Sequence, residues 1–128
     1  MANLRIMQKV LLVADRQSVI DQVHAALAGA DVVLIDYADS DTAAATAYEQ
    51  DIDAVLVDMQ VGSMGAMAVA RDVRAKAASA PEIPVTILLD RQADAFLAGR
   101  SGAKNWVSKG APASELRAAL APTSAATT

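Results

Sequence analysis

Short runs of mostly apolar residues alternate along the chain with segments of helical periodicity. The runs cover residues 9–14, 31–36, 54–58, 85–89 and 103–108. A short apolar run without polar alternation is typical of a strand that is buried on both faces, as in a parallel sheet. Strict alternation with helices requires crossover connections, which place helices on both faces of such a sheet. The pattern therefore predicts an α/β fold of three layers.

Five helices are predicted between and after these strands. Their expected ranges are 17–28, 40–50, 65–79, 91–100 and 112–120, the fourth being short. Ser18 is a plausible cap of the first helix and Gly29 its stop, while Ser40 or Asp41 would cap the second. A chain of 128 residues is about one domain. Among five-stranded parallel sheets, the flavodoxin-like (βα)5 arrangement with strand order 2-1-3-4-5 fits this length.

The chain is divided accordingly into an N-terminal arm, one domain and a flexible tail. The predicted boundaries are 1–8, 9–121 and 122–128. The arm shows no clear period, and the tail after Leu120 is a low-complexity segment that begins at Pro122.

Charged residues stand where several of the predicted strands end. Asp15 and Asp90 follow two strands, Asp58 ends a third, and Lys109 follows the fifth. Ligands of open α/β sheets bind at the carboxyl ends of the strands. Carboxylates that face a lysine there would suit Mg²⁺ and phosphoryl chemistry. A flavin site is disfavoured because the first turn, residues 14–17, is acidic and lacks a glycine-rich phosphate cradle. Alternatively, Asp58 simply ends its strand or caps the next helix.

Composition excludes several other functions. A net charge of −4 and a pI near 4.7 argue against direct nucleic-acid binding, which needs a basic patch. With no cysteine and a single histidine, His24, the chain has no His-based zinc site and no Cys/His or Ser/His pair for hydrolysis. No apolar run approaches the roughly 18 residues that cross a bilayer, so membrane insertion is not expected. We expect a cytoplasmic protein that is not an enzyme.

Three separate stretches carry a resemblance to a known family. They are Leu-Leu-Val-Ala-Asp at 11–15, Val-Leu-Val-Asp-Met at 55–59 and Gly-Ala-Lys-Asn-Trp-Val-Ser-Lys at 102–109. In this order and near this spacing, the chain resembles the receiver domain of bacterial two-component response regulators from about residue 9 to residue 120.

The resemblance implies a role for each matching residue. Asp58 would be the phosphoacceptor, a nucleophile towards a phosphohistidine of a sensor histidine kinase or phosphotransfer protein. Asp15, Asp58 and the main-chain carbonyl of Gln60 would bind Mg²⁺, and Lys109 would neutralise phosphoryl oxygens. Trp106 takes the position of the aromatic switch residue. Because the chain ends soon after the fifth helix, we expect a stand-alone receiver that signals through a separate output protein.

Departures from the family pattern predict an atypical receiver. Ala14 replaces the first of two acids, so we expect weak Mg²⁺ binding. Leu89 replaces the Thr or Ser that grips the phosphoryl group and has no hydrogen-bonding group. Asp90, at a position that is usually small, would oppose phosphorylation or compete for Lys109, or would merely cap the fourth helix.

Two glycines replace family prolines. Gly110 follows the lysine, where a cis peptide bond is common in the family and where we expect a trans bond because cis is costly without proline. Gly62 takes the proline position after the phosphoacceptor. The alternative to phosphate acceptance is a pseudo-receiver that acts as a constitutive protein-interaction module and in which Trp106 keeps one rotamer.

Overall fold

The computed structural model describes residues 7–62, 65–91 and 94–121. Within these ranges, five parallel strands form one sheet in the order β2-β1-β3-β4-β5. The strands are β1 (Gln8–Val13), β2 (Val32–Tyr37), β3 (Ala54–Asp58), β4 (Val85–Leu89) and β5 (Asn105–Ser108). The predicted α/β fold and its strand order are confirmed. β1 begins one residue before its predicted start, and the predicted 122–128 tail lies outside the described residues.

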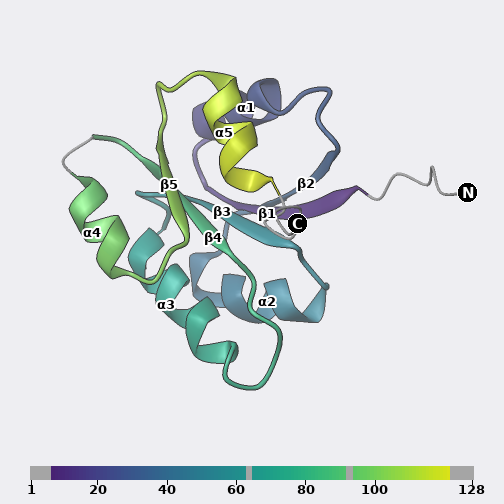
Figure 1. Cartoon of the computed structure of the whole chain (residues 1–128), viewed down its shortest axis with the longest axis vertical. Helices are drawn as coiled ribbons and strands as arrows, with labels where there is room; N and C mark the ends of the chain where they lie inside the picture. The colour runs from purple at the N-terminus through teal and green to yellow at the C-terminus, as the bar shows by residue number, and fades with distance from the viewer. Residues whose placement is uncertain (1–6, 63–64, 92–93, 122–128) are drawn as a thin grey trace, which may run out of the picture.

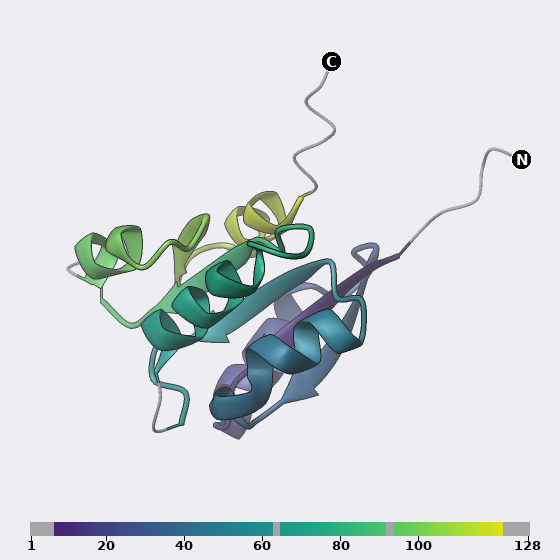
Figure 2. The same ribbon diagram turned by 90° about the horizontal axis from the view of Figure 1, so that it is seen from below.

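Helices cover both faces of the sheet. They are α1 (Gln17–Ala26), α2 (Ala43–Glu49), α3 (Ala66–Lys76), α4 (Ala95–Arg100) and α5 (Ala113–Leu120), with a 3₁₀ turn η1 (Ser40–Thr42) before α2. Figure 1 shows α1 and α5 above the sheet and α2 and α3 below it. Figure 2, turned by 90°, shows α2 and α3 side by side across the sheet. In the described ranges, no helix is long and apolar enough to cross a bilayer.

Two apolar cores explain why the strand sequences are continuous rather than alternating. Val10 and Leu12 of β1 pack on the α1 and α5 side, whereas Leu11 and Val13 pack on the α2 and α3 side. Every residue of β3, the central strand, is buried. Burial on both faces removes the polar positions that a one-sided strand would carry. The central strands thereby deliver their last residues to one edge of a rigid sheet.

The predicted helix caps are wrong. α1 begins at Gln17, as predicted, but its N-cap is Arg16 and not Ser18, and Arg16 makes no side-chain cap hydrogen bond. Ser40 lies in η1, where the Asp39 carboxylate accepts a hydrogen bond from the Asp41 N–H at 3.0 Å. α2 then starts after Thr42 without a side-chain cap. Neither helix therefore starts from the side-chain cap that the sequence indicated.

Candidate functional site

Asp58 is the buried centre of the candidate site. It is the last residue of β3, and its side chain is 0% exposed. Its Oδ1 lies 2.6 Å from Lys109 Nζ and accepts a hydrogen bond from the Gln60 N–H at 3.2 Å. Its Oδ2 lies 3.3 Å from Arg16 Nη2. Both carboxylate oxygens therefore have a cationic partner, which compensates the loss of solvation on burial.

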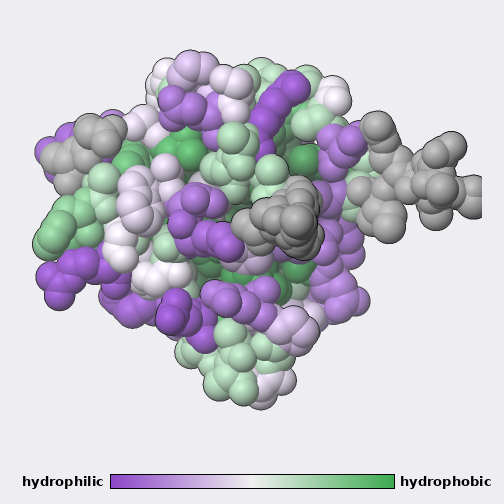
Figure 3. All heavy atoms as spheres, viewed as in Figure 1, coloured by the Kyte–Doolittle hydropathy of each residue, from purple (hydrophilic) through white to green (hydrophobic). Residues whose placement is uncertain are grey.

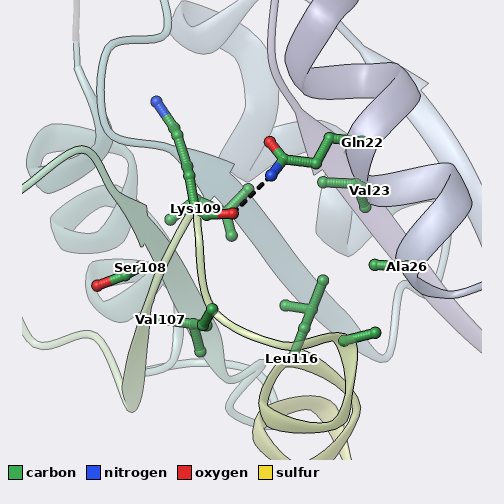
Figure 4. A pocket seen from close by; sticks show the side chains of 10 residues that line it. Gln22, Val23, Ala26, Val107, Ser108, Lys109 and Leu116 are labelled. Carbon is green, nitrogen blue, oxygen red and sulfur yellow. Dashed lines mark hydrogen bonds between the residues drawn. The ribbon is translucent and has the colours of Figure 1, made fainter.

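Lys109 follows β5 and is fixed through its backbone. Its N–H donates to the Leu89 carbonyl at 3.0 Å, and its own carbonyl accepts a hydrogen bond from Gln22 Nε2 at 2.5 Å. Figure 4 shows this bond from α1, beside a pocket between α1 and α5, with the Lys109 ammonium group extending away from the pocket. The Lys109 side chain is only 15% exposed. The backbone of Lys109 is thus fixed by β4 and α1, and its ammonium group lies beside Asp58.

Asp90 shares the cations of Asp58. Its Oδ1 contacts Lys109 Nζ and lies 4.0 Å from Arg16 Nη2. This contact is the one that the predicted competition for Lys109 requires. The alternative, in which Asp90 caps the fourth helix, is wrong for α4, because α4 begins at Ala95 after Asp94.

The third carboxylate, Asp15, is tied to a loop. Its Oδ2 accepts a hydrogen bond from the Gly62 N–H at 2.9 Å. Among the residues described, no group of three or more His, Cys, Asp or Glu side chains could hold a metal ion. Asp90, for its part, faces Lys109 and Arg16.

A smaller donor set still suits Mg²⁺. The carboxylates of Asp15 and Asp58 and the main-chain carbonyl of Gln60 are oxygen donors, which Mg²⁺ prefers, and it often keeps several waters beside one or two carboxylates. Ala14, which stands where the resemblance predicts the first of two acids, is buried, and its methyl side chain offers no oxygen to a metal ion. The donor chemistry fits the ion, although Arg16 adds a positive charge at one oxygen of Asp58.

Gly62 has a conformation and surroundings that only glycine accepts easily. Its φ is +49°, and a Cβ added there would lie 2.6 Å from Ser40 Oγ. A proline at this position would also have no N–H to donate to Asp15. A glycine instead of a proline at position 62 thus allows the hydrogen bond from the Gly62 N–H that holds the Asp15 carboxylate.

We expect Gly62→Ala to lower the unfolding free energy by about 1–2 kcal/mol, because a left-handed residue with a Cβ is strained and the Ser40 contact adds to the strain. Urea denaturation would measure this change. Gly29→Ala is the matched control, since Gly29 has φ +83° with nothing within 4 Å of its added Cβ. A loss at Gly62 no larger than at Gly29 would contradict a role for the Ser40 contact.

The two predicted switch positions lie in different environments. Leu89 is fully buried in the core on the α2 and α3 side. Trp106 is 39% exposed, and its ring lies against α4, where a Cβ added to Gly99 would approach the ring to 3.3 Å. The described residues contain no cis peptide bond, so the expectation of a trans Lys109–Gly110 bond is confirmed.

Arg16 is the site residue that the sequence analysis missed. The available signal was a cation directly after Asp15, at the same sheet edge as Asp58 and Lys109. His24 forms a surface contact in which its Nε2 lies 2.8 Å from Asp36 Oδ1.

Comparison with known proteins identifies one matching family model and several similar solved structures. The family model described as "Response regulator receiver domain" matches residues 10–121. No curated protein matches the chain. Several solved structures resemble it over most of its length.

One similar structure is the BeF3-activated N-terminal receiver domain of Klebsiella pneumoniae RstA. It has 25% identity, coverage of 88% of this chain and 95% of that one, and a TM-score of 0.75. Another is the chemotaxis protein CheY4 of Vibrio cholerae, with 24% identity, 89% and 96% coverage and a TM-score of 0.73. A third is the receiver domain of the sensor histidine kinase PA1611 of Pseudomonas aeruginosa PAO1, which has a magnesium ion in its active site cleft. Its identity is 23%, its coverage 88% and 93%, and its TM-score 0.73.

Proposed function

The chain belongs to the family of response regulator receiver domains of two-component systems, and from this premise we propose that it accepts a phosphoryl group on Asp58 and signals through protein-protein contacts. The observation that carries the proposal is the pair formed by buried Asp58 and Lys109, with 2.6 Å between Oδ1 and Nζ. A carboxylate with a fixed ammonium group beside it is arranged to receive a phosphoryl group, because the ammonium compensates the charge of the incoming oxygens.

The proposed donor is a phosphohistidine of a sensor histidine kinase or a phosphotransfer protein. A carboxylate oxygen of Asp58 attacks phosphorus, the P–O bond forms, and the P–N bond to the histidine breaks. Lys109 stays beside the transferred oxygens, while the Gln60 N–H holds the carboxylate in place. Mg²⁺, which we propose is bound weakly by Asp15, Asp58 and the Gln60 carbonyl, supplies further positive charge when bound. The role is that of a phosphoacceptor, not of an enzyme.

An exposed apolar surface supports signalling to a separate output protein. We define the α4–β5 patch as Phe96, Leu97 and Trp106, whose large apolar side chains are exposed. Figure 3 shows apolar residues at the left edge of the molecule, where Figure 1 places α4. Exposed aromatic and aliphatic groups are typical of protein interfaces, whereas a net charge of −4 disfavours nucleic acid. We place this exchange in the cytoplasm, because the cysteine-free sequence needs no oxidising compartment.

Intact mass spectrometry after incubation with a small acyl phosphate and Mg²⁺ tests the proposal. We expect the wild-type chain to gain the mass of one phosphoryl group and Asp58→Asn to gain none, because the amide lacks the nucleophilic carboxylate oxygen. Asp72→Asn on α3 is the matched control and should behave as the wild type. Absence of any gain in the wild type would overturn phosphate acceptance and favour the pseudo-receiver, in which Asp58 serves only as an ion-pair partner.

A further inference from the structure

Arg16 bridges the two carboxylates at the mouth of the site. It precedes α1 with an extended backbone, and its side chain is 47% exposed. Its Nη2 lies 3.3 Å from Asp58 Oδ2 and 4.0 Å from Asp90 Oδ1. The guanidinium group therefore lies between a buried acceptor and a more exposed one.

The two oxygens of Asp58 have different partners. Lys109 Nζ and the Gln60 N–H both contact Oδ1, whereas the cation in contact with Oδ2 is Arg16. Of the two oxygens, Oδ2 thus has the single cation Arg16 beside it, whereas Oδ1 has two donors. A guanidinium group stays charged at every pH that a folded protein tolerates, so Arg16 cannot become neutral to admit another cation.

The burial of Asp58 makes its contact with Arg16 different from an ordinary surface ion pair. Exposed pairs contribute little because water and salt screen both partners. Here the acceptor is fully buried although the donor is half exposed. The guanidinium group therefore compensates a carboxylate that solvent does not reach, and a second cation at Oδ2 would have to displace it.

We propose that Arg16 is a tethered counter-cation that competes with Mg²⁺ for Oδ2 of Asp58. Asp90, 4.0 Å from the same Nη2, gives the guanidinium group a second carboxylate to occupy when it leaves Oδ2. Metal binding then requires Arg16 to move from Asp58 towards Asp90. This inference rests on the proposed function in that it concerns regulation of the same aspartate.

Titration with Mg²⁺ alone tests the competition without any phosphorylation. Tryptophan fluorescence reports through Trp106, the only tryptophan, and NMR shifts of the Gln60 and Gly62 amides report at the site itself. Arg16→Gln should bind Mg²⁺ roughly tenfold more tightly than the wild type, a factor typical of coupled binding equilibria. Because Arg16 makes no side-chain cap hydrogen bond, its replacement should leave the start of α1 intact, which the same NMR spectra would verify.

Arg71→Gln on α3 is the charge-matched control, since it removes one exposed positive charge outside the site. Its Mg²⁺ affinity should stay within about twofold of the wild type, because distant surface charges are screened. In the Asp58→Asn background, Arg16→Gln should no longer tighten binding.

Equal Mg²⁺ affinities of Arg16→Gln and Arg71→Gln would overturn the inference, and so would no detectable binding by any of the variants. Phosphate acceptance is decided separately by the mass of the wild-type chain. A chain that fails to accept phosphate can still show metal competition, and a chain that accepts phosphate can lack it. The failure of one proposal is therefore distinguishable from the failure of the other.

Discussion

Lys109→Met is expected to lower the unfolding free energy by roughly 3 kcal/mol, near the lower end of the loss when one partner of a buried ion pair is removed. Methionine keeps much of the length of the lysine stem but leaves Asp58, which is 0% exposed, without its contact at 2.6 Å. Arg16 and the Gln60 N–H remain beside the carboxylate, which is why we expect the lower end of that range.

Urea denaturation followed by circular dichroism would measure this loss. Lys104→Met is the matched control, because Lys104 is exposed and should change the stability by less than about 0.5 kcal/mol. The double variant Asp58→Asn/Lys109→Met should recover most of the lost stability, since no buried charge is then left uncompensated. A double variant as unstable as Lys109→Met would assign the effect to the lysine's contact with Asp90 instead.

The fold could be predicted because its strongest signals are local. Buried parallel strands must be apolar along their whole length, and β3 and β4 are buried at every position. The helix periodicity of α1 and α5 likewise follows from Val19, Val23 and Leu116, which pack in one core. The helix caps could not be predicted, because Arg16 and Thr42 precede α1 and α2 without a side-chain cap hydrogen bond, so no capping residue marks these starts in the sequence.

The site was predictable only in part. Asp58 and Lys109 follow from topology, since β3, β4 and β5 are parallel neighbours in sequence along the sheet and their carboxyl ends lie at one edge. The role of Arg16 could not be predicted in the same way, because its contact with Asp58 depends on how a long side chain crosses from the turn after β1 to β3. The contact of the Gly62 N–H with Asp15 depends on a left-handed backbone conformation, for which glycine in the sequence is a weak indication.

Leu89→Ala is expected to lower the unfolding free energy by about 3 kcal/mol, as is common when a buried leucine is truncated and its cavity only partly closes. Leu89 is 1% exposed and belongs to the core that contains Val57 and Ile87. Leu97→Ala on α4 is the matched control, since Leu97 is exposed and should lose less than about 1 kcal/mol. Equal losses at the two positions in urea denaturation would contradict the packing role of Leu89.

The same burial is expected to limit how the proposed phosphorylation of Asp58 changes the α4–β5 patch. Leu89→Thr restores the hydroxyl of the family pattern, but it should be about as unstable as Leu89→Ala, because a smaller side chain then buries a hydroxyl without a phosphoryl acceptor. A phosphoryl mimic should recover part of that loss in Leu89→Thr, since the hydroxyl gains an acceptor, and should recover none of it in Leu89→Ala. In the wild type, where Leu89 offers no such bond, NMR shifts caused by the mimic should stay near Asp58 and leave Trp106 in one rotamer. Widespread shifts over residues 104–120 of the wild type would show that the switch operates without the hydroxyl.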